Sequence, residues 1–227
     1  MIFAGIVAGG KGSRIKSNKL PKQYIKIGDK TILEHVIEKF VVIEKIDKVY
    51  VGINEEYEKT AKELCKKYGA RVELVIGGKE RNITLYNIVN RIHEEYGYGH
   101  HHLISHDAAR PFVQKEIINK HCSIPENYDA ITTAVNSTDT IVEVDCDGNV
   151  TRVPKRISMY NCQTPQTFYT DDYVKILEMF GKENFTDISG LYLYANKKVK
   201  IIEGSYDNIK ITSDIDLLVA EKIILNN

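Results

Sequence analysis

The chain has 227 residues, of which 43% are hydrophobic, enough for one α/β domain with a sizeable buried core. Its 31 basic and 31 acidic residues cancel, so no global charge attracts nucleic acid or an anionic membrane, and any phosphate binding has to be local. The cysteines form no C-x-x-C pair, and the apolar stretch at the N-terminus is too short for a secretory or membrane segment, which predicts free thiols in a soluble cytoplasmic protein.

The first predicted element is a buried strand, Ile2–Ala8, that runs into a glycine-rich turn. Glycines allow the backbone to bend sharply and to direct several N–H groups towards one anion, and basic residues follow nearby. We therefore predict a loop for a polyphosphate, most naturally that of a nucleotide. The spacing fits neither the P-loop nor the Rossmann fingerprint, and the alternative is a tight turn with solvated charges. The residues concerned are Gly9, Gly10, Gly12, Arg14 and Lys22.

The next part of the chain alternates between helical and strand patterns, which favours a mostly parallel sheet covered by helices. A capping box of Thr31 and Glu34 begins a helix that is expected to end near Val42. Ligands of such sheets bind beyond the carboxyl ends of the strands, so the loops after residues 8, 76 and 106 are candidate site loops. The further elements expected here are strands Lys48–Ile53, Val72–Ile76 and Leu103–His106 and helices Tyr57–Lys67 and Arg81–Glu95.

A β-hairpin is predicted in the second half of the chain, with Thr140–Val144 and Val150–Val153 as its strands. Because an isolated hairpin is marginal in water, we expect an arm of about residues 137–160 that packs on a second subunit. No linker interrupts the pattern, so residues 1–227 are predicted to form a single domain. The remaining expected elements are helices Thr170–Met179, Ile188–Asn196 and Ser213–Leu225 and strand Val199–Glu203.

A carboxylate and a guanidinium, Asp107 and Arg110, stand just after a predicted strand. Magnesium in nucleotidyl transfer is typically held by one or two carboxylates together with the substrate's phosphates, so Asp107 could hold it alone. The alternative is a local ion pair that caps the turn. A later polar turn offers a second candidate ligand, Asp207, and a candidate phosphate-binding cation, Lys210.

Together, these segments resemble the cytidylyltransferases of the methylerythritol-phosphate and ribitol-phosphate type. The resemblance implies a three-layer, Rossmann-like nucleotidyltransferase fold with a mostly parallel sheet and a protruding β-hairpin arm that is exchanged in a homodimer. It also implies CTP and Mg²⁺ as requirements and pyrophosphate as a product. The motifs that carry it are Ala8-Gly9-Gly10-x-Gly12-x-Arg14, Pro21-Lys22-Gln23-Tyr24, Gly78-x-x-Arg81, His106-Asp107-Ala108-x-Arg110-Pro111, Asp139-Thr140, Gln163-Thr164-Pro165-Gln166, Thr186-Asp187 and Asp207-Asn208-Ile209-Lys210.

The resemblance also implies roles for individual residues. The catalytic cations, which hold the triphosphate and stabilise charge at the α-phosphorus, would be Arg14, Lys22 and Lys210. The nucleotide would lie against Ala8, Gly9, Gly10, Gly12, Gly77, Gly78, Arg81 and Thr84. Asp107 would bind Mg²⁺. The acceptor would contact Arg110, Thr140, Arg156, Thr164 and Thr186, with Thr140 and Arg156 reaching from the partner's arm.

Two segments of the chain bear on the identity of the acceptor. The segment Gln163–Phe168 and the opening Met1–Ile6 look more like the ribitol-phosphate branch, so D-ribitol 5-phosphate is the expected acceptor. Methylerythritol phosphate and glycerol phosphate are the alternatives. Two other hypotheses remain: a nucleotide-binding regulatory protein without turnover, and a nucleotidyltransferase for a sugar 1-phosphate and another base.

Overall fold

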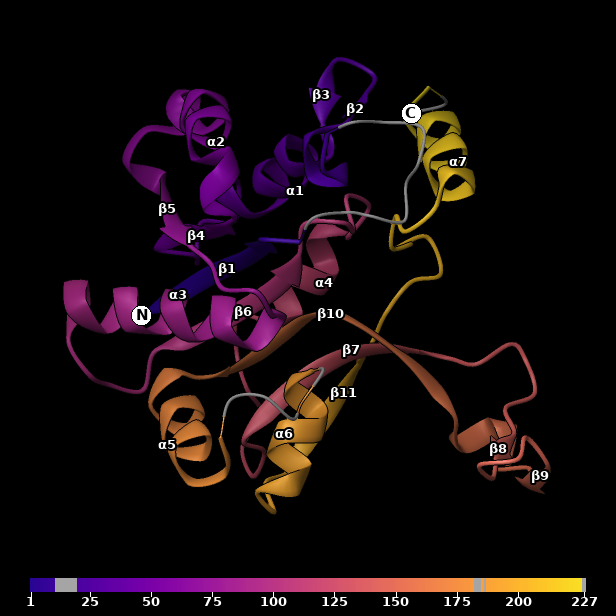
Figure 1. Ribbon diagram of the computed structural model, residues 1–227. Helices are drawn as coiled ribbons and strands as arrows, with labels where there is room; N and C mark the ends of the chain where they lie inside the picture. Colours follow the sequence, from indigo (N-terminus) through magenta and orange to yellow (C-terminus); the bar gives the residue numbers. More distant parts are fainter. Residues whose placement is uncertain (11–19, 182–184, 186, 226–227) are drawn as a thin grey trace.

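The computed structural model describes residues 1–10, 20–181, 185 and 187–225 (Figure 1). At its centre lies a seven-stranded sheet of order β11-β7-β10-β6-β1-β4-β5. Among these strands β10 alone is antiparallel to its neighbours, β6 and β7, so the sheet is mostly parallel, as predicted. The strands are β1 (Ile2–Ala8), β4 (Lys48–Ile53), β5 (Val72–Ile76), β6 (His102–Asp107), β7 (Ala130–Asn136), β10 (Tyr160–Tyr169) and β11 (Val199–Glu203).

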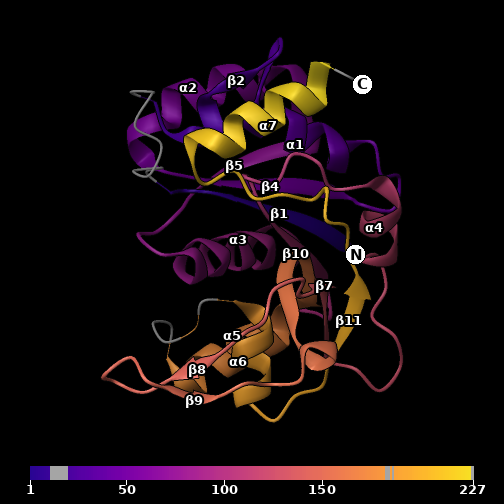
Figure 2. The same cartoon turned by 90° about the vertical axis from the view of Figure 1, so that its right-hand side faces the viewer.

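Helices cover both faces of the sheet, which gives the three layers seen in Figure 2. One apolar core joins the sheet to α1, α2 and α4, and a second joins it to α3, α5 and α6. A third, smaller core holds α7 against the short hairpin of β2 (Lys26–Ile27) and β3 (Lys30–Thr31). The helices are α1 (Ile32–Val41), α2 (Glu58–Cys65), α3 (Arg81–Tyr96), α4 (Lys115–Lys120), α5 (Thr170–Phe180), α6 (Ile188–Tyr194) and α7 (Asp214–Leu225).

Helix α1 illustrates how local sequence fixes these elements. The Thr31 hydroxyl accepts a hydrogen bond from the Glu34 backbone N–H, and the Glu34 carboxylate accepts one from the Thr31 N–H, so the predicted capping box is present. The helix buries Val36, Ile37 and Phe40 completely, on the face that the spacing predicted. Local capping and tertiary burial therefore support the same helix.

Close packing places α3 against the strands that lead to the site. A Cβ at Gly52 of β4 would lie 2.3 Å from Cγ2 of Thr84, so only glycine allows the helix to approach this closely. The first turn of α3 consequently lies beside the carboxyl ends of β4 and β5.

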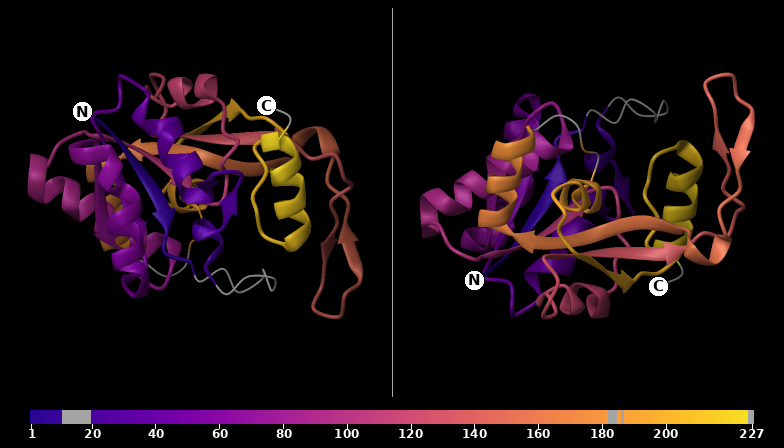
Figure 3. Two further views of the ribbon diagram at one scale, coloured as in Figure 1. Left: turned by 90° about the horizontal axis from the view of Figure 1, so that it is seen from above. Right: turned by 90° about the horizontal axis from the view of Figure 1, so that it is seen from below.

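The hairpin arm projects away from the rest of the molecule (Figures 1 and 3). Its strands, β8 (Glu143–Val144) and β9 (Val150–Arg152), are shorter than predicted. The turn between them holds Gly148 at φ +85°, and the Asp145 carboxylate accepts hydrogen bonds from the backbone of Asp147 and Asn149. The arm's apolar side chains are exposed and form no core of their own: Ile141, Val142, Val144, Val150 and Val153.

Several elements differ from the sequence prediction. The pattern did not predict strands β7 and β10 or helix α4, and the predicted helix Tyr57–Lys67 is α2 flanked by the 3₁₀ turns Glu55–Tyr57 and Lys66–Arg71. All four cysteines are free thiols, as predicted. No helix in the described ranges is long and apolar enough to cross a bilayer.

Replacement of Thr31 by Ala is expected to lower the free energy of unfolding by about 1 kcal/mol, because it removes the capping hydroxyl of α1. Urea denaturation followed by circular dichroism measures the change. Lys39→Ala, at an exposed position of the same helix, is the matched control and should change stability by less than about 0.5 kcal/mol. Equal stability of the two variants would show that the box does not stabilise the fold.

Candidate active site

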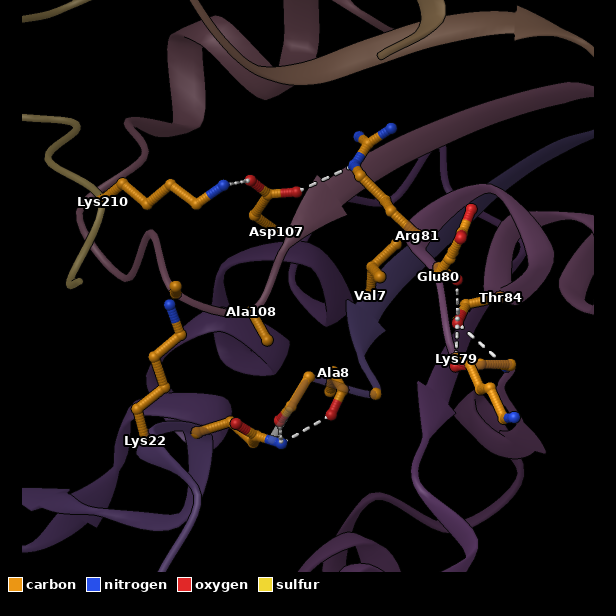
Figure 4. A pocket seen from close by; sticks show the side chains of 15 residues that line it. Val7, Ala8, Lys22, Lys79, Glu80, Arg81, Thr84, Asp107, Ala108 and Lys210 are labelled. Atoms are coloured by element: carbon orange, nitrogen blue, oxygen red, sulfur yellow. Dashed lines mark hydrogen bonds and ion pairs between the residues drawn. The ribbon is translucent and has the colours of Figure 1, made fainter. Parts of the chain in front are cut away.

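A pocket lies at the edge of the sheet where β1, β5 and β6 end (Figure 4). It is built from the turn after β1, the 3₁₀ turn Lys22–Tyr24, the start of α3, the end of β6 and Lys210. The predicted loops after residues 8, 76 and 106 therefore meet, because parallel strands bring their carboxyl ends to one edge. We call this the first pocket. Its lining includes Ala8, Gly9, Gly10, Lys22, Gly78, Arg81, Thr84, Asp107 and Lys210 from the predicted set.

Gln23 anchors the turn after β1. Its side-chain amide donates hydrogen bonds to the carbonyls of Ala8, at 2.7 Å, and Gly10, at 2.9 Å, and its side chain is buried. With these carbonyls held by Gln23, the glycine backbone is fixed where it lines the pocket. The neighbouring Lys22 also lines the pocket, and its ammonium donates to the carbonyl of Ile211, at 2.8 Å.

A second turn, at Gly77 and Gly78, forms the opposite wall. The Gly78 N–H donates to the Thr84 hydroxyl, at 3.1 Å, and a Cβ on Gly77 would lie 2.7 Å from the same oxygen. Thr84 therefore fixes a turn that only glycine can form. Beside it, an adjoining hollow continues from the first pocket and is lined by Gly9, Gly10, Asn54, Glu55, Ile76, Gly77, Gly78 and Lys79.

Asp107, the last residue of β6, is the electrostatic centre of the site. One carboxylate oxygen lies 3.2 Å from Nε of Arg81, and the other lies 2.8 Å from Nζ of Lys210 and 4.0 Å from Nε of Arg110. Burial by itself raises the pKa of Asp107, but the surrounding cations hold that pKa well below its usual range. The carboxylate is thus ionised at every physiological pH.

Two of the guanidinium groups around Asp107 have N–H donors that no described residue accepts from. Nη1 of Arg81 and Nε of Arg110 are buried and have no hydrogen-bond partner among the described residues. Buried donors are normally paired, and guanidinium groups pair best with phosphate or carboxylate oxygens. Three cations with one carboxylate also leave net positive charge. The arrangement is suited to binding an anion rich in oxygen.

A second pocket lies on the other side of the same residues. It shares Arg81, Asp107 and Lys210 with the first pocket, so these side chains form the boundary between the two. Its remaining lining is Arg110, Cys162, Gln163, Thr164, Gln166 and Asp187.

Strand β10 supplies the side chains that hold this boundary in place. The Thr164 hydroxyl accepts a hydrogen bond from the Asp107 N–H, at 3.1 Å. The Gln166 amide oxygen accepts from Nη2 of Arg81, and its nitrogen donates to the carboxylate of Asp187, the N-cap of α6. Gln23 and Gln166 were not predicted as site residues. The available signal was their place inside the motifs, since Gln23 follows Lys22 directly and Gln166 stands two residues after Thr164.

The other predicted site residues lie apart or cannot be placed. Thr140 and Arg156 are exposed on the arm, where Arg156 donates to the Thr138 carbonyl. Asp207 lies in the turn before Lys210 and contacts Ser205, and it lines neither of the two pockets as the described residues define them. Gly12, Arg14 and Thr186 lie outside the described residues.

Comparisons with known proteins agree on one family. The family model for IspD, 2-C-methyl-D-erythritol 4-phosphate cytidylyltransferase, matches residues 2–226. The chain is 36% identical to ribitol-5-phosphate cytidylyltransferase of Streptococcus pneumoniae serotype 2, with 99% of each chain covered. Its fold matches 4-diphosphocytidyl-2C-methyl-D-erythritol synthase of Anaerococcus prevotii, with a TM-score of 0.84 and 28% identity over 99% of this chain and 96% of that chain.

A second solved structure, 2-C-methyl-D-erythritol 4-phosphate cytidylyltransferase of Francisella tularensis, matches with a TM-score of 0.80 and 25% identity over 97% of this chain and 98% of that chain. These matches confirm the predicted fold and the predicted resemblance along the whole chain. The chain belongs to the IspD family of cytidylyltransferases, which are nucleotidyltransferases.

Proposed function

We propose that this protein transfers the cytidylyl group of CTP to D-ribitol 5-phosphate, forming CDP-ribitol and pyrophosphate. The observation that carries the proposal is the boundary of Arg81, Asp107 and Lys210 between two pockets, since a group transfer needs two substrates that meet at one charged point. The acceptor is proposed from the 36% identity to a ribitol-5-phosphate cytidylyltransferase, which exceeds the 28% identity to the methylerythritol enzyme of Anaerococcus prevotii.

CTP would occupy the first pocket. The backbone of Gly9 and Gly10 and the ammonium of Lys22 would bind its triphosphate, and the turn held by Thr84 would contact the ribose and cytosine. Lys210, at the boundary, lies where it could neutralise charge at the α-phosphorus. Preorganised charge of this kind is usually the largest contribution to catalysis, about 3 kcal/mol for one well-aimed donor.

The acceptor phosphate would lie in the second pocket, against Arg110. One of its oxygens attacks the α-phosphorus, a new P–O bond forms, and the bond to the leaving pyrophosphate breaks with its electron pair. A phosphate monoester is largely dianionic near neutral pH, since its second pKa is about 6, so the reaction needs no general base. Positioning and charge neutralisation are sufficient.

The residues also fit the Mg²⁺ that we propose as the metal. Asp107 stays ionised, as a ligand must, and one carboxylate together with substrate phosphates is a usual Mg²⁺ environment. No three His, Cys, Asp or Glu side chains gather into a metal site within the described part of the chain, so the phosphates would have to supply the other ligands. Bound there, Mg²⁺ would neutralise charge on the triphosphate.

We further propose that the acceptor site is completed by Thr140 and Arg156 from the arm of a second copy. Both residues are exposed on a hairpin whose apolar side chains have no core within the described chain. Packing against a partner would bury those side chains and bring a further cation to the acceptor phosphate.

The acceptor assignment is tested with a pyrophosphate-release assay that contains CTP, Mg²⁺ and one acceptor at a time. Ribitol 5-phosphate is expected to give the highest kcat/KM, at least about tenfold above methylerythritol 4-phosphate and glycerol phosphates, because correctly placed hydroxyl groups are worth 1–3 kcal/mol or more. UTP and GTP serve as nucleotide controls. A clear preference for another acceptor would overturn the assignment but leave the cytidylyl transfer standing.

Lys22→Ala should reduce kcat by at least about 100-fold, because it removes a cation that contacts the triphosphate. The measurement is steady-state kinetics with CTP and the best acceptor. Lys26→Ala is the matched control, since Lys26 is an exposed lysine of the same segment that lines neither pocket. If both variants turned over like the parent protein, Lys22 would not have the assigned role.

Shared active sites are tested by mixing two weakly active variants, Lys22→Ala and Arg156→Ala. In a heterodimer, one of the two sites combines an intact pocket with an intact arm, and the other site carries both substitutions. Random exchange of subunits makes about half of the dimers heterodimers, so about a quarter of the parent activity is restored. Sedimentation velocity on the parent protein gives the oligomeric state. A monomer, or a mixture no more active than its two components, would refute the exchanged arm.

A further inference from the structure

His106 is buried completely beneath the site, between Asp107 and the core of the molecule. It has no part in the proposed reaction, yet both ring nitrogens have partners in the site. Nε2 lies 3.0 Å from the backbone carbonyl of Arg110, and Nδ1 lies 3.1 Å from the hydroxyl of Thr164. The same hydroxyl accepts the hydrogen bond of the Asp107 N–H.

Burial disfavours the charged imidazole, and for the neutral ring these contacts fit one arrangement of protons. A backbone N–H can only donate, so the Thr164 oxygen accepts from Asp107, and its own O–H is left able to donate to Nδ1 of His106. A carbonyl can only accept, so Nε2 of His106 carries the proton and donates it to Arg110. The neutral imidazole is then protonated on Nε2. One continuous chain of hydrogen bonds runs from the Asp107 backbone to the Arg110 backbone.

This chain fixes the two ends of a short segment relative to each other. Asp107 and Arg110 begin and end the turn after β6, which is closed by a hydrogen bond from the Arg110 N–H to the Asp107 carbonyl. His106 adds a second closure and links the turn to β10 through Thr164. The Phe40 ring packs on the imidazole, with centroids 5.1 Å apart, and restricts its rotation.

This chain of hydrogen bonds also helps to hold Arg110, which lines the second pocket. Nη1 of Arg110 is also held, by the carbonyl of Asn208 at 2.8 Å, so the guanidinium is fixed from both its backbone and its tip. Its unpartnered Nε then lies on the Asp107 side, 4.0 Å from the carboxylate. Without His106, the carbonyl of Arg110 and the hydroxyl of Thr164 would each lose a partner.

We propose that His106 is a positioning residue for the transfer reaction, which holds Asp107 and Arg110 in the relative geometry that binds the acceptor phosphate next to the metal ligand. The inference rests on the proposed function, because it names the substrate group that Arg110 binds. It predicts that loss of His106 affects the acceptor and kcat more than it affects binding of CTP, because Thr164 and Arg110, which pair with its ring nitrogens, line the second pocket and not the first.

The chain offers a matched control in a second buried histidine. His121 is also completely buried and also uses both ring nitrogens, which lie 2.8 Å from the hydroxyls of Thr133 and Thr167. Neither threonine lines the first or the second pocket as described. A purely structural role for buried histidines would therefore make His106 and His121 variants behave alike.

The test compares His106→Ala, His106→Gln and His121→Gln by thermal unfolding and by steady-state kinetics with varied acceptor. His106→Ala is expected to lower kcat/KM for the acceptor by about 10- to 100-fold, as is usual when a group that orients a ligand is lost. His106→Gln, whose amide can still donate to the Arg110 carbonyl, should recover part of this loss. KM for CTP should change by less than about threefold, and His121→Gln should retain the parent kinetics even where its Tm falls.

The results distinguish a positioning role of His106 from a purely structural role. Equal kinetics of the folded His106 and His121 variants, or a loss that follows KM for CTP instead of the acceptor, would overturn the inference. A parent protein without turnover for any acceptor would instead overturn the proposed function. In that case ¹⁵N NMR of the parent protein still tests the geometry, since His106 must be the neutral tautomer protonated on Nε2, and protonation on Nδ1 would contradict the chain of hydrogen bonds.

Discussion

The site depends on one buried carboxylate and the cations that surround it. The chain as a whole has no net charge, yet Arg81, Arg110 and Lys210 converge on the single carboxylate of Asp107. Buried charges that lack partners destabilise a fold by about 3–5 kcal/mol, so Asp107 makes this concentration of cations tolerable before a substrate arrives. It also leaves them with an excess of positive charge. The stabilising ion cluster and the proposed anion-binding site are therefore the same set of atoms.

The antiparallel strand β10 makes two pockets out of one sheet edge. Because β10 runs between β6 and β7, its side chains approach Asp107 from the side opposite the glycine turn. Thr164 and Gln166 thereby reach the backbone of Asp107 and the guanidinium of Arg81, two residues whose side chains separate the second pocket from the first. A fully parallel sheet would place a loop, not a strand, at this point. The insertion of β10 therefore accounts for two pockets that share one charged boundary.

Strands with a clear apolar pattern were predicted from the sequence. The bounds of β1, β4, β5 and β11 coincide with the expected strands, since each is a run of mainly apolar residues between polar turns. Strands β7 and β10 were missed because both contain threonines, and β10 also glutamines, whose polar groups are satisfied by tertiary partners such as His121. The site residues also divide into those that the sequence pattern predicts and those whose role depends on tertiary contacts. Charged residues could be proposed from type and motif, whereas the roles of Gln23 and Gln166 depend on which carbonyl or guanidinium the fold brings within reach.

The exposed arm indicates how the two substrates would depend differently on a partner. The first pocket is formed by the body of one chain, so under the proposed function CTP would bind to a single copy. The second pocket has Arg110 and the boundary cations, while Arg156 lies on a hairpin whose apolar residues need a surface to pack against. If the partner's arm supplies Arg156, assembly adds a cation only on the acceptor side. The affinity for the acceptor phosphate would then depend on assembly, because a dianion gains most from a further positive charge in a partly buried pocket.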